Sequence, residues 1–263
     1  MNRRVRMLVC LAGVAGIAVL VVLSAVRMPH FGGDYHPYRD RAVPAATKHR
    51  TANVISSVNF DQRALDTLGE ETILLASVVG AAVLLRPGKK ERERQARPRP
   101  PRVLESTKFA GYVLLPLTLV LGVDIIAHGG ITPAGGFQGG VVLATGLHLT
   151  YVSGSYSALE RIRPFTVFEQ GDVLGAAGFV GLGLAGLAAT SAFLANTLPL
   201  GHFGALVSGG TVQLLSAAVG VEVASGVIVM LAQFFDQALV IGRRDDAQDD
   251  ERAENTAAAE SSA

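Results

Sequence analysis

Cysteine, tryptophan and charge are all scarce in this sequence of 263 residues. Tryptophan is absent and Cys10 is the single cysteine, which excludes an internal disulfide framework and a metal site built from several cysteines. Charged residues make up only 17% of the chain, whereas a typical globular chain carries about 25%. The composition therefore argues against a soluble protein, although the length alone would suit one or two soluble domains.

Lysine and arginine are missing from two long stretches, residues 109–160 and 164–242. The 23 basic residues form five clusters, with three in residues 1–6, six in 27–63, nine in 86–108, two in 161–163 and three in 243–252. Apolar residues make up 49% of the chain. This alternation is typical of a polytopic membrane protein, in which basic loops flank apolar spans. Binding to nucleic acid is therefore not expected.

Crossing a bilayer takes roughly 20 apolar residues in a helix, and six segments reach or approach this length. They are residues 7–26, 67–85, 109–127, 139–156, 173–195 and 208–239. The predicted fold is therefore all-α, a polytopic membrane protein with about six transmembrane helices. For the first segment a cleavable signal peptide is the alternative, but the length of the apolar run favours an uncleaved span.

Polar segments divide the chain into parts. Residues 1–103 are predicted to hold two spans, an exterior loop at 27–63 and a basic cytoplasmic linker at 86–102. Residues 104–242 are predicted to form a four-helix membrane domain. Residues 243–263 are acidic and rich in alanine and serine, so a disordered tail is expected there.

Glu222 lies near the middle of the last predicted span, about 20 Å from either end at 1.5 Å per residue. On a helical wheel, Thr211 and Gln233 share its face, with Ser225 and Asp236 alongside. A carboxylate at this depth is costly and usually marks a functional path. Hydrogen bonding to a neighbouring helix is the alternative explanation.

Two other spans carry ionisable candidates for an ion path. Asp124 and His128 are four residues apart at the end of the third span, and hence lie on one helical face. An interfacial pair that ends the helix is the alternative. His148 lies midway along the fourth span, where an imidazole can relay protons, although such a histidine more often hydrogen-bonds to a neighbouring helix.

Glu70 and Glu71 stand at the start of the second span. The sequence Thr67-Leu-Gly-Glu70 has the spacing of a capping box, in which threonine and glutamate satisfy the first backbone amides of a helix. Capping would explain Glu70 alone. Because Asp61, Asp66 and Glu71 crowd the same place, Glu70 and Glu71 are also candidates for the ion path.

Glycine gathers before the fourth span and small residues recur in the fifth. Six of residues 129–140 are glycine, which permits positive φ and close backbone contact. A packed, irregular connection is therefore predicted, and a phosphate-binding loop is excluded because no Gly-Lys-Ser/Thr follows. Small residues spaced by four predict a ridge for close helix packing; they are Ala177, Gly181, Ala185 and Ala189.

Two segments resemble parts of known ion-translocating complexes. Residues 133–141, with the apolar helix after them, resemble the signature of the MnhB/MrpB-like subunit of Mrp-type multisubunit Na⁺/H⁺ antiporters. Residues 59–71 resemble the E-type subunit of membrane-bound hydrogenases, a unit that also occurs in the C-terminal region of the largest antiporter subunit. The matching motif residues are Pro133, Gly135, Gly136, Phe137, Gln138, Gly139 and Gly140 in the first segment, and Asp66, Thr67, Leu68 and Gly69 in the second. Ala134, Ala64 and Leu65 depart from these patterns.

The resemblance implies an accessory, non-enzymatic subunit of a Na⁺/H⁺ antiporter in the bacterial cytoplasmic membrane. It implies other antiporter subunits and the lipid bilayer as partners, Na⁺ and H⁺ as transported ions, and no cofactor. The main pumping subunits of such complexes carry lysines inside their helices, and the predicted spans here contain none. The alternatives are a subunit of a redox-coupled complex, such as an energy-converting hydrogenase or a complex I-like pump, and a purely structural scaffold.

The distribution of basic residues predicts that both termini are cytoplasmic. With this orientation the interior segments hold 17 Lys and Arg and the exterior segments hold six, in agreement with the positive-inside rule. In a Cys10→Ser background, a cysteine placed at His49 should react with an impermeant thiol reagent added from outside, and one placed at Gln95 should not. The reverse labelling pattern would refute this topology.

Overall fold

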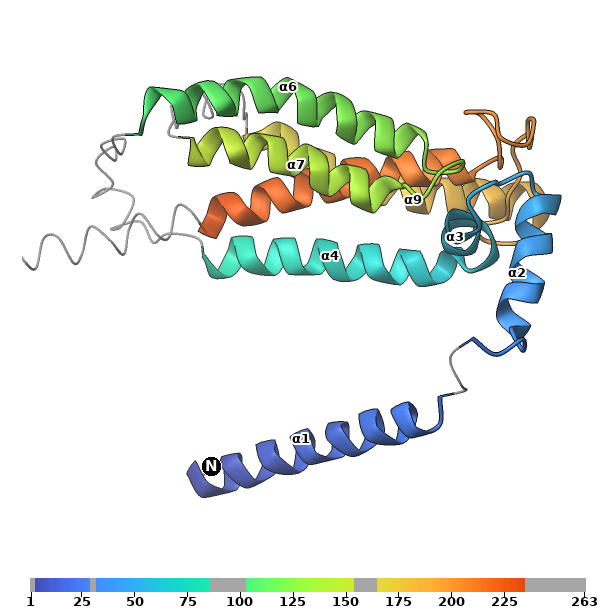
Figure 1. Cartoon of the computed structure of the whole chain (residues 1–263), viewed down its shortest axis with the longest axis horizontal. Coiled ribbons are helices and arrows are strands. Elements are labelled where there is room, and N and C mark those ends of the chain that lie inside the picture. The colour runs from blue at the N-terminus through green and yellow to red at the C-terminus, as the bar shows by residue number, and fades with distance from the viewer. Residues whose placement is uncertain (1–2, 29–31, 86–102, 154–164, 235–263) are drawn as a thin grey trace, which may run out of the picture. The chain divides into compact units, whose positions relative to one another are not determined.

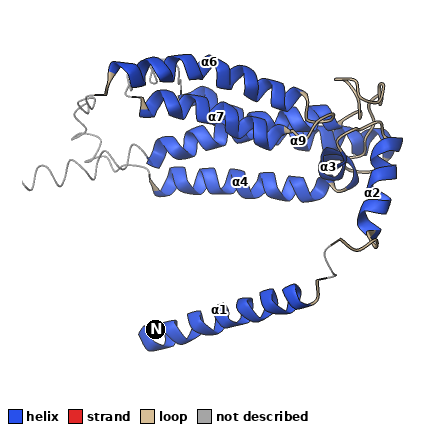
Figure 2. Cartoon of the chain, in the orientation of Figure 1, coloured by secondary structure: helices blue, strands red, loops and turns tan. Residues whose placement is uncertain are grey.

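The computed structural model describes residues 3–28, 32–85, 103–153 and 165–234, and the regular secondary structure within these ranges is helical (Figure 2). The chain divides after Arg41 into two compact units. The first holds α1 (Arg3–Val26), an apolar helix of 24 residues, none of them buried. The predicted linker at 86–102 and the predicted tail at 243–263 lie outside the described residues.

The second unit is a bundle of long helices that run side by side (Figure 1). Its elements are α4 (Ala64–Leu84), α6 (Glu105–Ala127), α7 (Gly136–Val152), α9 (Phe165–Thr190) and a last helix, Val212–Phe234, here called the central helix. With α1, five described helices are long and apolar enough to cross a membrane. The described part of α7 has 17 residues, so it falls just short. The prediction of an all-α, multi-pass membrane protein is confirmed.

The central helix is the core of the second unit. Of its most apolar stretch 61% is buried, against 11–22% for α4, α6 and α9. Its apolar face forms one cluster with aromatic rings from two other elements; the cluster holds Phe60, Ala64, Phe179, Leu194, Val212, Leu215, Val219 and Val223. α4, α6 and α9 therefore present most of their apolar surface outward, as expected for helices in contact with lipid or with other subunits.

The glycines at the start of α7 mark its contacts with two helices. A Cβ added at Gly140 would lie 2.8 Å from the Cβ of Val223 and 2.9 Å from the carbonyl oxygen of Gly220, and one at Gly136 would collide with the Ser216 carbonyl. The predicted close backbone contact is therefore confirmed, because no side chain fits between α7 and the central helix at these positions.

The expected irregular backbone at these glycines is wrong in its second half. Residues 128–135 form turns, but α7 begins at Gly136, so Gly139 and Gly140 are helical. At Gly139 an added Cβ would meet Ile126 and the Gly122 carbonyl of α6. The physical reason for these glycines is thus the space between helices and not a left-handed backbone.

The small-residue ridge predicted in the fifth span packs against nothing in the described part of the chain. Ala177, Gly181, Ala185 and Ala189 are exposed, and a Cβ added at Gly181 would meet no atom within 4 Å. The packed face of α9 is a different one, and it is defined by Gly171, Gly175, Phe179, Gly183 and Gly186. The prediction of close packing on this helix holds, but among the described residues the packed face of α9 is not the face that was predicted.

The segment expected as an exterior polar loop is folded. It contains α2 (Pro37–Lys48), α3 (Val54–Ser57) and a π-helical turn, η1 (Val58–Gln62). Residues 42–63, the turns at 128–135 and the segment 191–211 are tied together at one end of the bundle, here called the loop end. The ties include Asn53 N–H donating to the Gly130 carbonyl and Arg50 donating to the Gly201 carbonyl.

Asn53 makes the densest set of these ties. Its Oδ1 accepts from the backbone amides of Ile55 and Ser56 and so caps α3. Its Nδ2 lies 2.8 Å from the carbonyl oxygen of Gly129 and 2.7 Å from that of Thr132. On the other side of the same turns, Gln213 of the central helix accepts from Gly130 N–H and donates to the Ala127 carbonyl. The turns at 128–135 are therefore held from both sides.

Replacement of Gly140 tests the helix contact. Gly140→Ala should destabilise the protein by about 1–3 kcal/mol, the usual cost of overpacking, and should reduce its incorporation into membranes or complexes. Gly178→Ala is the matched control, because a Cβ there would lie 3.8 Å from the Ala218 Cβ, an ordinary contact. Thermal unfolding in detergent would measure both variants. Equal melting temperatures would refute the claim that Gly140 is needed for packing.

Asn53→Ala should loosen the loop end. It removes a helix cap and leaves carbonyl groups without their donor, so a loss of about 2–3 kcal/mol is expected. Limited proteolysis within residues 42–62 and the melting temperature would report it. Thr72→Ala serves as control, since that hydroxyl bonds only to the Leu68 carbonyl of its own helix. Wild-type protease resistance in Asn53→Ala would contradict the assignment.

Candidate functional site

Three carboxylate side chains from three different helices are buried in the bundle. Glu71 of α4 is 1% exposed, Asp172 of α9 is 3% exposed, and Glu222 of the central helix is fully buried. Glu71 and Glu222 lie against each other, and Asp172 is close enough to act on both through its charge. We call these residues the carboxylate triad.

Close helix packing seals the triad from both sides of the central helix. At Gly175 an added Cβ would lie 2.6 Å from both the Cβ and the backbone nitrogen of Glu222. One turn further along the central helix, Gly226 lies against Asp172 Oδ1 on one side and Val78 of α4 on the other. The glycines of α9 and the central helix thus leave no room for a further side chain at these contacts with the carboxylates.

The triad lacks the partners that buried carboxylates normally have. Both oxygens of Glu71, both of Glu222 and Oδ1 of Asp172 are buried with no hydrogen-bond donor among the described residues. An ionised carboxylate only accepts hydrogen bonds, so the two glutamates can bond to each other only when one of them carries a proton. Such groups require a proton, a cation or water to offset their burial.

Basic side chains do not offset the triad from within its own helices. Residues 64–85, 165–190 and 212–234 contain no Lys, Arg or His. His148 of α7 is half-buried, on a turn whose Ala144 and Leu147 pack against Ile228 of the central helix. It therefore lies beyond the level of Gly226, at the side of the bundle away from the loop end. The described residues hold no group of three or more His, Cys, Asp or Glu arranged to bind a metal ion.

Of the two glutamates predicted near the start of α4, only Glu71 faces the core. Glu70 is exposed, and the capping-box prediction is wrong, because α4 begins at Ala64 and not after Thr67. The Thr67 hydroxyl instead donates to the Asn59 carbonyl at 2.8 Å, inside the protein. The earlier helix start carries Glu71 two turns into the bundle, where it meets Glu222.

Asp124 and His128 form the predicted pair on one face of α6. The His128 Nδ1 lies 3.1 Å from Asp124 Oδ1 and 3.0 Å from its carbonyl oxygen. Their side chains are 59% and 41% exposed, so the pair stands at the end of the helix and apart from the triad. This geometry agrees with the interfacial alternative given above.

Asp172 was missed by sequence reasoning. The fifth span was expected to begin at residue 173, which left this carboxylate outside the membrane segment. The helix instead begins at Phe165, so Asp172 lies about 10 Å inside it at 1.5 Å per residue. The available signal was an acidic residue directly before an apolar run and flanked by glycines on the same helical face, Gly171 and Gly175.

The polar stripe predicted around Glu222 is largely buried. Thr211 stands just before the central helix and is 4% exposed, Ser225 is 6% exposed, and Gln233 is half-buried. Asp236 lies outside the described residues. Burial of three polar side chains along one face of an apolar helix supports the sequence argument that this face is not a lipid contact.

The remaining motif residues surround these contacts without joining the triad. Phe137 and Leu68 pack against the main apolar cluster, and Asp66 pairs with Arg63 at the exposed start of α4. Pro133, Gln138 and Gly69 are exposed, while Gly135 is buried. The motifs therefore mark the loop end and the helix contacts that position the carboxylates.

A family model described as a domain related to the MnhB subunit of Na⁺/H⁺ antiporters matches residues 106–229. An uncharacterised protein of Methanocaldococcus jannaschii is 29% identical over 202 residues, which cover 68% of this chain and 76% of that protein. Asp172 and Glu222 lie inside the matched domain and Glu71 lies outside it.

Two solved structures have the same fold. A chain of the membrane-bound sulfane sulfur reductase, an archaeal respiratory membrane complex, matches with a TM-score of 0.69 at 24% identity over 88% of this chain and 98% of that one. A chain of the Mrp complex from Dietzia sp. DQ12-45-1b matches with a TM-score of 0.64 at 23% identity, over 89% of this chain but only 26% of that one. Residues 106–229 therefore form an MnhB-related domain, within a membrane protein that shares the fold of both solved structures.

Proposed function

We propose that this chain is a membrane subunit of an Mrp-like Na⁺/H⁺ antiporter and that its carboxylate triad forms part of the ion path. The MnhB-related domain and the likeness to a chain of an Mrp complex support the first statement. The second rests on one observation: Glu71, Asp172 and Glu222 come from three helices, are buried together and have no donors among the described residues.

The chemistry of the triad suits an exchange of ions. A buried carboxylate must be neutralised by a proton, a cation or bound water. Two carboxyl groups in contact can release a proton when a monovalent cation arrives, which leaves the buried charge unchanged. Antiport of Na⁺ against H⁺ requires a site with this property, and Glu71 and Glu222 provide the groups for it.

A purely structural role for the triad is less compatible with its environment. Structural polar networks in protein interiors are satisfied, because each unpaired buried polar group costs free energy. Here five carboxylate oxygens have no partner among the described residues. The free-energy cost of burying these carboxylates is explained if they act in transport, and not if they only hold helices together.

The likeness to the sulfane sulfur reductase chain favours one other candidate function, a membrane subunit coupled to a redox module. Both solved relatives share only the fold at their levels of identity. Purification of the native complex would separate the candidates, since antiporter subunits alone, or iron–sulfur subunits as well, would be identified with this chain. In either case we infer other membrane subunits as partners, with both termini in the cytoplasm of a bacterial cell.

Glu222→Gln should abolish transport while leaving assembly intact. The substitution keeps the size of the side chain and removes its ability to exchange a proton for a cation. We expect Na⁺-dependent proton movement across inverted membrane vesicles to fall by about a hundredfold, the scale set by loss of a positioned proton carrier. The amount of assembled complex would be measured in the same membranes.

Glu169→Gln is the matched control for this experiment, because Glu169 lies on α9 but is exposed. Glu71→Gln and Asp172→Asn should behave like Glu222→Gln. Wild-type transport in all three triad variants would assign the carboxylates to packing and would refute their place in the path.

A further inference from the structure

A second buried carboxylate site lies at the loop end, outside the triad. His49, directly after α2, places its Nδ1 2.5 Å from Oδ2 of Asp61 in the π-helical turn η1. The His49 side chain is 38% exposed, whereas the Asp61 side chain is 5% exposed. The imidazole of His49 is therefore the half-exposed group that contacts the buried Asp61 carboxylate.

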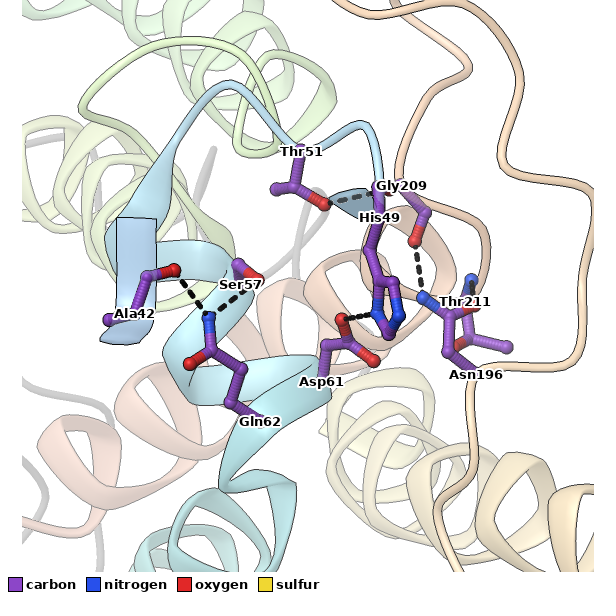
Figure 3. A network of polar contacts seen from close by, with 9 residues as sticks. All are labelled: Ala42, His49, Thr51, Ser57, Asp61, Gln62, Asn196, Gly209 and Thr211. Atoms are coloured by element: carbon purple, nitrogen blue, oxygen red, sulfur yellow. Dashed lines mark hydrogen bonds and ion pairs between the residues drawn. The ribbon is translucent and has the colours of Figure 1, made fainter. Parts of the chain in front are cut away.

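Polar contacts lead from this pair to the start of the central helix (Figure 3). The Thr51 hydroxyl lies 3.5 Å from the His49 carbonyl oxygen and is packed against Gly209. The Gly209 carbonyl accepts from Asn196 Nδ2 at 2.9 Å, and Asn196 Oδ1 accepts from the Thr211 amide at 2.9 Å. These residues, here called the polar layer, form two sets of hydrogen bonds at the loop end, and the packing of Thr51 against Gly209 joins the two sets.

Two hydroxyl groups in this layer are buried without a partner. Ser208 is 2% exposed and Thr211 is 4% exposed, and neither side-chain oxygen has a hydrogen-bond partner among the described residues. Buried hydroxyls in a polar surrounding normally bind ordered water. They therefore add two unpaired polar groups to the layer at the start of the central helix.

An apolar layer separates this site from the triad. The rings of Phe60 and Phe179 lie 6.4 Å apart and pack with Leu215 and Val219 of the central helix. These positions on the central helix fall between Thr211 and Glu222, which are about 16 Å apart at 1.5 Å per residue. The His49–Asp61 pair is therefore a distinct site and not an extension of the triad.

We propose that His49 and Asp61 form a second proton-exchange site, which loads and unloads the path at the loop end. This proposal rests on the proposed function. In the loading step Nε2 of His49 takes a proton from a hydronium ion, which leaves as water, while the Nδ1–H bond breaks and an O–H bond forms on Asp61 Oδ2, so the pair gains one proton in total. The proton then passes the apolar layer toward Glu71 and Glu222 when that layer opens or becomes hydrated.

Other charged or titratable groups at this end belong to separate contacts. Arg50 donates to the Gly201 carbonyl, Arg63 pairs with Asp66, and His128 pairs with Asp124. Lys48 and His202 are the other basic residues within 42–63, 128–135 and 191–211, and α2 also carries Arg39, Asp40 and Arg41. A change in His49 should act on the response to pH through its direct contact with Asp61.

The test uses the complete complex in proteoliposomes of known orientation, with the pH varied on one face at a time. His49→Gln and Asp61→Asn should slow Na⁺-dependent proton movement roughly tenfold to a hundredfold. They should also flatten the dependence of the rate on the pH of the face that carries residues 42–62, with the pH dependence on the opposite face unchanged. Glu105→Gln is the control, because it breaks an exposed ion pair with Lys108 far from both sites.

Wild-type rates and pH profiles in an assembled His49→Gln complex would overturn the proposal, as would equal flattening on both faces. If Asp61→Asn prevents assembly, His49→Gln alone tests the proposal, since the half-exposed side chain of His49 can be replaced by an amide. Glu222→Gln separates the two ideas. If that variant is impaired and His49→Gln is normal, only the loop-end site fails. If Glu222→Gln, Glu71→Gln and Asp172→Asn all transport normally, the triad path itself fails.

Discussion

The contact between α9 and the central helix is the constraint on which the rest of the bundle depends. Gly175 lies directly on the backbone of Glu222, and Gly226 lies directly on the carboxylate of Asp172. At this separation neither helix has room for side chains that would shield or pair with the acids. The glycines that allow the tight helix packing therefore also leave the buried carboxylates without partners. A Cβ at Gly175 or Gly226 would disturb both the packing and the surroundings of the carboxylates.

The loop end fixes the position of α4 along the axes of α9 and the central helix. Asn53 and Gln213 hold the turns at 128–135 from opposite sides, and η1 is tied back to α2 by Gln62 donating to the Ala42 carbonyl. A helix of 1.5 Å rise places Glu71 beside Glu222 only if its start is set to within about one residue. The part of the chain before the MnhB-related domain is thus required to complete the triad.

The sequence allowed the all-helical membrane fold, the burial of Glu222 and the close contacts of Gly136 and Gly140 to be predicted. These follow from helix length, depth and residue size, which are local properties. The distinction between Glu70 and Glu71, and the place of Asp172, depended on where α4 and α9 begin. Helix starts inside polar segments are weakly encoded by the local residue properties on which the sequence argument relied.

Two polar regions separated by an apolar layer are what an exchanger needs in physical terms. A continuous hydrated chain from the surface to Glu222 would let protons cross without any coupled ion, and the gradient would be lost. The rings of Phe60 and Phe179 lie 6.4 Å apart in this layer, and under the proposed function such an apolar constriction would exclude water between the two regions. Phe60 directly precedes Asp61 in η1, so one short turn contributes both a ring of the apolar layer and the carboxylate of the proposed loop-end site.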